Sequence, residues 1–262
     1  MKKSLIALAL VSAFAAPVFA EEAAAPAAAP EAKPLTANVG LVSNYIFRGI
    51  SQTQGKPAIQ GGFDYAHESG LYVGTWGSNV NWVSATGIKD DNSMEWDFYA
   101  GYKGTFAEDF SYDAGVLQYY YPGTLNAGAA NANSTEVYAL IGWKFITLKY
   151  NYTVSSHLFG WVGTSGEKTR GSGYIDLTAN YDLGDGWGVN GHVGRQVVKG
   201  FSAASYNDIK IGVTKDIGFG VVGLAYTDTN ANSCGDTTPA YCWGNHKDVA
   251  KGAAVLSFTK TF

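Results

Sequence analysis

The amino-acid sequence predicts an all-β protein, a closed antiparallel transmembrane β-barrel of twelve strands with short periplasmic turns and longer extracellular loops. Three observations predict this fold class. Apolar and polar residues alternate along many segments, the connections between these segments alternate between short and long, and a signal peptide precedes them. The composition agrees, because only 15% of the residues are charged, against about 25% in an ordinary soluble domain, whereas 14% are aromatic. Few charges and many aromatic rings suit a surface that contacts lipid.

The first 20 residues have the features of a secretory signal peptide. Lys2 and Lys3 precede a short apolar run, and small residues supply a cleavage site after Ala20. Residues 21–34 are rich in Ala, Pro and Glu and cannot bury apolar area, so we expect a periplasmic tether there. Cleavage removes two lysines and no acid, which changes the net charge from −4 to −6. This mild acidity argues against a nucleic-acid partner.

Residues 35–262 are predicted to form the barrel, and a period-two alternation locates its strands. In the segment 95–106, for example, large apolar residues fall on one face and acidic residues on the other. The same alternation occurs in residues 35–41, 59–65, 110–117, 135–145, 148–155, 175–183, 187–196 and 208–214, and a last strand lies near 249–262. Residues 71–80 and 219–228 complete the twelve strands, but their patterns are too mixed to assign faces.

The connections between these segments alternate in length. Short connections are expected at 67–70, 107–109, the passage near Ile146, 183–186 and 216–218. Long connections are expected at 48–55, 81–93, 122–133, 157–172, 199–206 and 229–248. Short turns at one rim and longer loops at the other are typical of outer-membrane barrels, and a soluble sandwich has no reason to sort its loops in this way.

We predict that the apolar face of each strand contacts lipid and that the polar face lines a wet interior. In the soluble alternative, the interior would have to hold Trp96, Trp143 and Trp187. Closure of the sheet also pairs the strand edges, which lipid cannot satisfy. No segment after residue 20 has about 18 consecutive apolar residues, which excludes membrane-spanning helices.

Aromatic residues gather near both ends of the predicted strands, as in the two girdles that mark the membrane interfaces. Those near the short turns are Phe106, Phe110, Tyr112, Phe145, Tyr181, Trp187 and Phe219. Those near the long loops are Tyr45, Trp96, Tyr120, Tyr152 and Tyr174. The general preference of strands for aromatic residues explains their number but not their placement.

The charged residues on the polar faces are candidates for lining the lumen. They are Arg48, Asp64, Glu95, Asp97, Lys103, Asp113, Glu136, Lys144, Lys149, Asp176, Asp182, Asp208 and Lys210. This set holds more acids than bases, which predicts at most a weak preference for cations. The same groups could instead pair into a network that plugs the barrel.

The last strand ends in Phe262, with Phe258 and Leu256 on the same face. A terminal phenylalanine resembles the signal by which bacterial barrels are recognised by the barrel-assembly machinery, although Lys260 departs from that pattern. The partners expected are therefore this machinery, the lipid and lipopolysaccharide of the outer membrane, and small hydrophilic solutes.

Four segments resemble the TorF-type porin family of proteobacteria. They are NYIFRGISQT at 44–53, GLYVGTWGSNV at 70–80, EWDFYAGY at 95–102 and TKTF at 259–262. The resemblance spans residues 35–262 and implies an outer-membrane barrel with channel activity, without naming a substrate.

Two cysteines, Cys234 and Cys242, lie in the longest outer loop, and a disulfide is expected between them in an oxidising compartment. They do not form a zinc motif with His246, and no cofactor or metal site is expected. An enzyme could be imagined around His157 and a neighbouring serine, but no acid is placed to orient the histidine. We therefore expect a porin for passive passage of small hydrophilic solutes, and the alternative is a plugged structural or adhesive barrel that acts through its loops.

Overall fold

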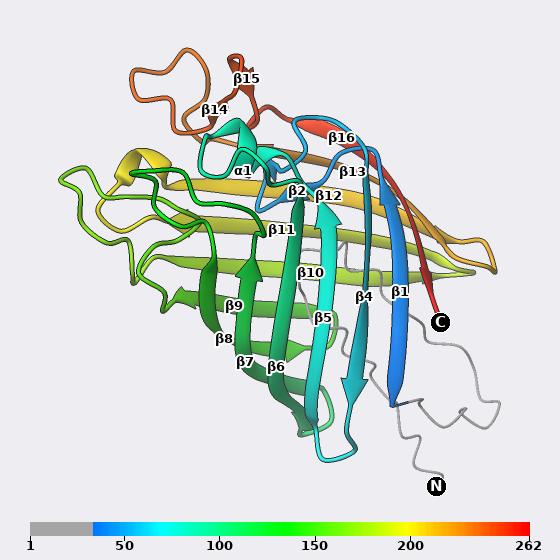
Figure 1. The fold of residues 1–262 in the computed structure, drawn as a ribbon. Helices are drawn as coiled ribbons and strands as arrows, with labels where there is room; N and C mark the ends of the chain where they lie inside the picture. Colours follow the sequence, from blue (N-terminus) through cyan, green and yellow to red (C-terminus); the bar gives the residue numbers. More distant parts are fainter. Residues whose placement is uncertain (1–33) are drawn as a thin grey trace, which may run out of the picture.

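The computed structural model describes residues 34–262, which form a closed barrel of twelve antiparallel strands (Figure 1). The strands are β1 (Leu35–Val42), β4 (Ala58–Ala66), β5 (Leu71–Asn79), β6 (Met94–Phe106), β7 (Phe110–Tyr120), β8 (Ser134–Trp143), β9 (Ile146–Thr153), β10 (Gly173–Gly184), β11 (Trp187–Val197), β12 (Tyr206–Asp216), β13 (Val221–Thr229) and β16 (Ala253–Thr261). Pairing of β1 with both β4 and β16 closes the sheet, which confirms the predicted fold class. The expected signal peptide, and the expected tether apart from Pro34, lie outside the described residues.

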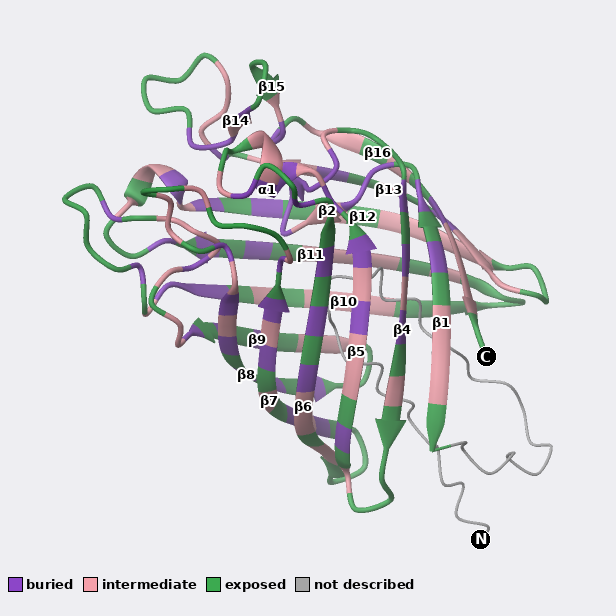
Figure 2. Cartoon of the chain, in the orientation of Figure 1, coloured by how far each residue is buried: buried purple, intermediate pink, exposed green. Residues whose placement is uncertain are grey.

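The large apolar side chains of the strands point outward, as their alternation predicts. Trp96, Trp143 and Trp187 are 43%, 45% and 47% exposed, whereas Glu95 and Asp97 on the opposite face of β6 are 1% exposed. Figure 2 shows the resulting alternation of buried and exposed residues along the strands. No helix among residues 34–262 is long and apolar enough to span a membrane.

The two strands with mixed patterns carry an inward aromatic residue or small residues. In β5, Trp76 is buried and pairs in register with Asp97 of β6, so that a tryptophan occupies an inward position. In β13, Leu224 points outward and is 53% exposed, but the inner face carries the small residues Gly223 and Ala225 beside the buried Thr227. Neither strand therefore has the simple apolar-outward alternation of its neighbours.

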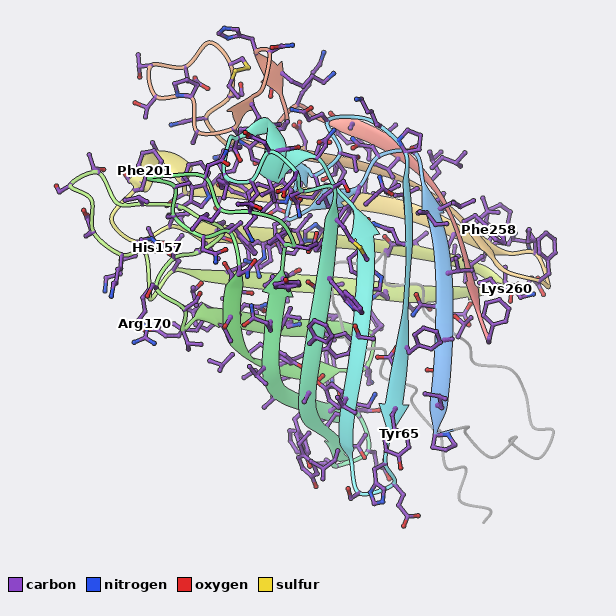
Figure 3. All side chains as sticks on the ribbon, viewed as in Figure 1. Tyr65, His157, Arg170, Phe201, Phe258 and Lys260 are labelled. Carbon is purple, nitrogen blue, oxygen red and sulfur yellow. A yellow bond between two sulfur atoms is a disulfide. The ribbon has the colours of Figure 1, made fainter. Side chains whose placement is uncertain are left out.

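The connections are sorted by length, as predicted, and Figure 1 shows the long loops together at one end of the barrel. We call this end the loop rim, and its six loops are L1 (43–57), L2 (80–93), L3 (121–133), L4 (154–172), L5 (198–205) and L6 (230–252). They contain the hairpin of β2 (Ile46–Phe47) and β3 (Ile50–Ser51), α1 (Trp82–Ala85), η1 (Ser202–Ala204), and the hairpin of β14 (Cys242–Trp243) and β15 (Lys247–Asp248). The opposite end, the turn rim, carries the short turns and the C-terminus. Tyr65, Phe258 and Lys260 lie toward it in Figure 3, whereas His157, Arg170 and Phe201 lie among the loops.

The aromatic residues near the turn rim are mostly exposed on the outside, as a girdle requires. Phe106, Phe145 and Phe219 are examples, with exposures of 47%, 43% and 62%. The prediction was wrong for two residues near the loop rim. Tyr45 and Tyr174 are 2% and 5% exposed and point into the barrel, because they contact the inward-folded L1 loop or belong to it.

Candidate functional site: the barrel interior and L1

Loop L1 folds into the barrel as a short hairpin. Phe47 of β2 pairs with Ile50 of β3, so Arg48 and Gly49 form a two-residue turn at the tip, with φ values of 48° and 76°. Positive φ at both positions is typical of the tight turns that join antiparallel strands. A Cβ atom on Gly49 would lie 2.6 Å from the Cβ of Asp208 in β12. The hairpin tip therefore touches the barrel wall so closely that a side chain at Gly49 would not fit.

The base of L1 is held by its own side chains. Ser51 Oγ donates to Asn44 Oδ1 at 2.6 Å, and the backbone N–H of Tyr45 donates to Thr53 Oγ1 at 3.1 Å. All four of these residues are buried. These bonds inside the loop satisfy polar groups that would otherwise lack partners in the barrel interior.

At the tip, Arg48 makes a bidentate ion pair across the barrel. Its Nη1 and Nη2 donate to the two carboxylate oxygens of Glu136 in β8 at 3.1 and 2.6 Å, and Nη1 also donates to Gln196 Oε1 in β11 at 2.8 Å. The hydroxyl of Tyr206 in β12 donates to the Arg48 carbonyl at 2.8 Å. L1 starts at β1 and ends at β4, whereas β8, β11 and β12 lie elsewhere around the barrel, so the hairpin crosses the lumen.

Arg48 stays charged in this setting. Burial alone would lower the pKa of its guanidinium, but the Glu136 carboxylate outweighs that effect and holds the pKa above its usual value. The guanidinium carbon also lies 4.7 Å from the ring centroid of Phe47 and 4.4 Å from that of Tyr174. Such contacts between a cation and aromatic faces add to the ion pair in holding L1 in place.

Two cavities meet at the L1 tip. The inner cavity, of about 200 Å³, is lined by charged and polar side chains among apolar ones; the polar residues include Gln60, Lys149, Asn151, Asp176, Asn190 and Lys210. The outer cavity, of about 240 Å³, lies among the loops and has aromatic walls. Phe47 and Arg48 line both cavities, so L1 separates the polar interior from the loop rim.

Exposure inside the barrel increases from the loop rim toward the turn rim. Glu95, Glu136 and Asp208 lie in the halves of their strands nearest the loops and are at most 1% exposed. The inward-facing Asp64 and Lys103 lie near the turns and are partly exposed. The interior is therefore covered at the loop rim and more accessible to water at the turn rim.

The structure divides the charged residues predicted to line the lumen into three groups. Buried in the interior are Arg48, Glu95, Asp97, Asp113, Glu136, Lys149 and Asp208. Partly buried are Asp64, Lys103, Asp176 and Lys210. The remaining two, Lys144 and Asp182, are exposed at the turn rim.

The prediction that Lys144 lies on a lumen-facing strand position is wrong. Lys144 has a φ of 52° in the two-residue turn between β8 and β9, which ends the alternation that predicted an inward direction. Its Nζ lies 3.6 Å from Asp109 in the neighbouring turn. Asp182 lies where the register of β10 and β11 shifts, and its Oδ1 accepts from the backbone N–H of Gly184 at 2.8 Å. Its carboxylate thus stabilises the turn.

Several polar residues outside the predicted set complete the interior. His192 lies between two predicted acids, with its ring nitrogens 3.4 Å from Asp176 and 3.4 Å from Asp208. Tyr119 donates to Glu136 at 3.2 Å, and Asn151 donates to the same carboxylate at 3.1 Å. These residues fall on the polar face of their strands, so the alternation could have located them, but a search limited to charged residues omits them.

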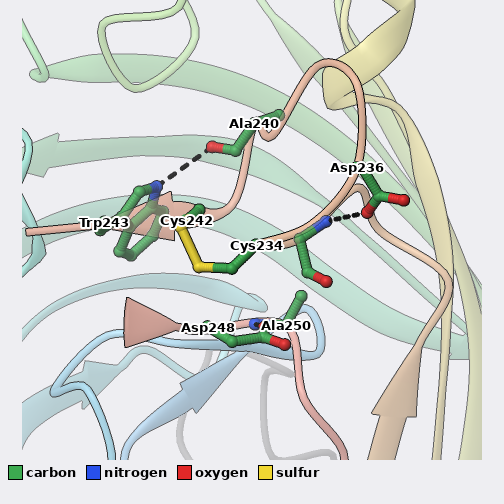
Figure 4. The surroundings of a disulfide bond; sticks show 8 residues. Cys234, Asp236, Ala240, Cys242, Trp243, Asp248 and Ala250 are labelled. Carbon is green, nitrogen blue, oxygen red and sulfur yellow. Dashed lines mark hydrogen bonds between the residues drawn. A yellow bond between two sulfur atoms is a disulfide. The ribbon is translucent and has the colours of Figure 1, made fainter. Parts of the chain in front are cut away.

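The loop side chains considered for a metal or enzyme site have structural partners instead. Cys234 and Cys242 form the predicted disulfide, which ties the base of L6 to β14 (Figure 4). His157 Nδ1 lies 3.0 Å from the Trp161 carbonyl, and Ser155 Oγ donates to the His157 carbonyl at 2.9 Å. The serine and the histidine ring are therefore not arranged as a nucleophile and base. No group of three or more potential metal ligands of the His, Cys, Asp or Glu type occurs within residues 34–262.

The model of one protein family matches residues 24–262. The chain belongs to the Gcw_chp family. The description of this family is bacterial protein of unknown function, so membership supplies no activity. The chain matches no protein in a search of curated proteins.

Among solved structures, the fold is similar to those of two porins. A NanC porin superposes with a TM-score of 0.55 at 11% sequence identity, and a KdgM porin with a TM-score of 0.51 at 5% identity. Each match covers 87% of this chain and 98% of the porin. Identities this low show a shared fold only. Together with the apolar exterior, the closed barrel places the protein in the bacterial outer membrane, as predicted.

Proposed function

We propose that the protein is a passive outer-membrane channel for small hydrophilic solutes, narrowed at rest by L1. The observation that carries this proposal is an inner cavity of about 200 Å³, into which charged and polar side chains project, inside a barrel whose exterior is apolar. Barrels of roughly eight strands are filled by side chains and those of roughly sixteen leave a channel, so a twelve-stranded barrel has room for water beside a folded-in loop.

One observation favours the alternative, a plugged barrel that acts through its loops. The Arg48–Glu136 pair is buried, and L1 separates the two cavities. The proposals differ in whether L1 leaves the lumen. We favour the channel because the hairpin is joined to the opposite wall by side-chain contacts, chiefly the Arg48–Glu136 ion pair, and can withdraw as a unit without breaking any strand pairing of the barrel.

We also propose a weak preference for cations. Without the two exposed residues at the turn rim, the interior still holds more carboxylates than lysines and arginines. The preference is weak because Arg48, Lys149 and Lys210 line the inner cavity directly, against the single acid Asp176. The resemblance to TorF-type porins and the role of Phe262 in assembly remain predictions from the sequence, consistent with this function.

Purified protein in a planar bilayer tests these proposals. We expect brief openings of small conductance and a reversal potential in a salt gradient that is shifted modestly toward the cation potential. An anion-selective reversal potential would contradict the cation preference alone. A bilayer without any current steps, with protein shown to be folded by its heat-dependent mobility on gels, would contradict the channel.

A further inference from the structure

The outer cavity has the properties of a small-molecule site. Its walls are aromatic side chains from four loops and one strand, namely Phe47, Trp82, Phe159, Trp161, Tyr206 and Tyr241. The rings support one another. Trp161 and Tyr206 lie 5.5 and 5.1 Å from Tyr241, and Trp82 lies 5.0 Å from Tyr121, all in edge-on contacts. Such mutual packing fixes the wall before any ligand arrives, as is usual for binding pockets.

Most polar groups of this wall already have partners within the protein. The Tyr241 hydroxyl donates to the Ala204 carbonyl at 2.7 Å, and Gln52 Nε2 donates to the Ile50 carbonyl at 2.9 Å. Arg48 is neutralised by Glu136. The indole N–H of Trp82 has no hydrogen-bond partner among the described residues, but its nitrogen is buried from the cavity as well as from solvent.

We propose that the outer cavity binds a small, uncharged aromatic molecule. Flat rings match the aromatic walls and can pack against them in edge-on or offset-stacked contacts. A sugar would bring many hydroxyls to a wall whose polar groups mostly have partners already. An anion would face an arginine whose charge is already paired.

The volume agrees with this class of ligand. A cavity of about 150 Å³ holds benzene, so about 240 Å³ accommodates one substituted ring. The bound molecule would rest on Phe47 and Arg48, directly above the L1 tip. Binding of this molecule does not depend on the proposed channel function. Its transport through the barrel would rest on that function.

Calorimetric titration of the purified protein in detergent with acetophenone, a small uncharged molecule with a single aromatic ring, tests this site. We expect saturable binding of acetophenone and none of glucose or benzoate at the same concentrations. Ile88→Trp fills the cavity from its half-buried edge and should abolish binding. Val162→Trp adds the same side chain at an exposed position that does not line the cavity and should change nothing.

Three results would overturn the proposal. They are the absence of saturable acetophenone binding beyond a detergent blank, equal binding of glucose, and unchanged binding in the Ile88→Trp variant. A protein that binds acetophenone but never conducts would contradict only the channel. A protein that conducts but binds no acetophenone would contradict only this site.

Discussion

Replacement of Arg48 by glutamine should release L1. The variant loses the guanidinium that makes three side-chain hydrogen bonds, and it leaves the Glu136 carboxylate, whose side chain is 0% exposed, without its cation. Removal of one partner from a buried ion pair costs about 3–5 kcal/mol. The cost falls on the state with L1 inserted, because withdrawal of the loop admits water to Glu136.

A tenfold change in an equilibrium corresponds to about 1.4 kcal/mol. The ratio of withdrawn to inserted L1 should therefore rise by roughly two to three and a half orders of magnitude. The assay is single-channel recording, in which the fraction of time spent open should increase sharply in Arg48→Gln. Glu136→Gln should act in the same direction, and the double variant should gain less than the sum of the two because both changes break one pair.

Lys144→Gln is the matched control. It removes a cation from an ion pair in which both side chains are 49% exposed, and exposed pairs contribute about 0–1 kcal/mol. Its open fraction should equal that of the unmodified protein. If Arg48→Gln stays within about threefold of the control, the energetic reasoning is refuted.

Two further predictions concern the exterior and the loops. Leu177→Arg places a charge on the outward face near the middle of β10, where it should cost about 2–4 kcal/mol of folding free energy in lipid vesicles titrated with urea. Glu68→Arg in an exposed turn is its control, and equal stability of the two variants would contradict the lipid-facing assignment. Replacement of Cys234 and Cys242 by serine removes a cross-link that restricts the unfolded loop by about 2–3 kcal/mol. Trypsin should then cut L6 faster at the exposed Lys247 while the barrel stays folded, and reduced unmodified protein should behave alike. Loss of the folded barrel would show that the disulfide supports more than L6.

The fold could be predicted because its signals are local. Alternation in β6 places Trp96 outward and Glu95 inward irrespective of the rest of the chain. The lengths of the connections then show which strand ends lie at the loop rim and which lie at the turn rim. Strand β5 resisted assignment because inward Trp76 packs edge-on against Tyr45 of L1, 5.6 Å away, which is a tertiary contact that alternation does not encode.

The sequence predicted which side chains face the interior, but not which partners they contact there. Alternation identifies Glu136 as inward-facing, yet its pairing with Arg48 depends on a loop 88 residues away along the chain. The turn at Arg48 and Gly49 was hard to predict from its residue types, because Arg48 has a positive φ, which is uncommon for a residue other than glycine. The error at Lys144 has the same origin, since a two-residue turn with positive φ interrupts the alternation without glycine to mark it.

The most direct test of a channel narrowed by L1 is the conductance of a barrel that lacks this loop. Replacement of residues 43–57 by Asn-Gly joins β1 to β4 at the pair Val42–Ala58 through a tight turn. We predict a folded barrel with steady openings of larger conductance than the brief openings of the unmodified protein. A folded barrel that remains silent without L1 would contradict the account, because something other than this hairpin would then close the lumen.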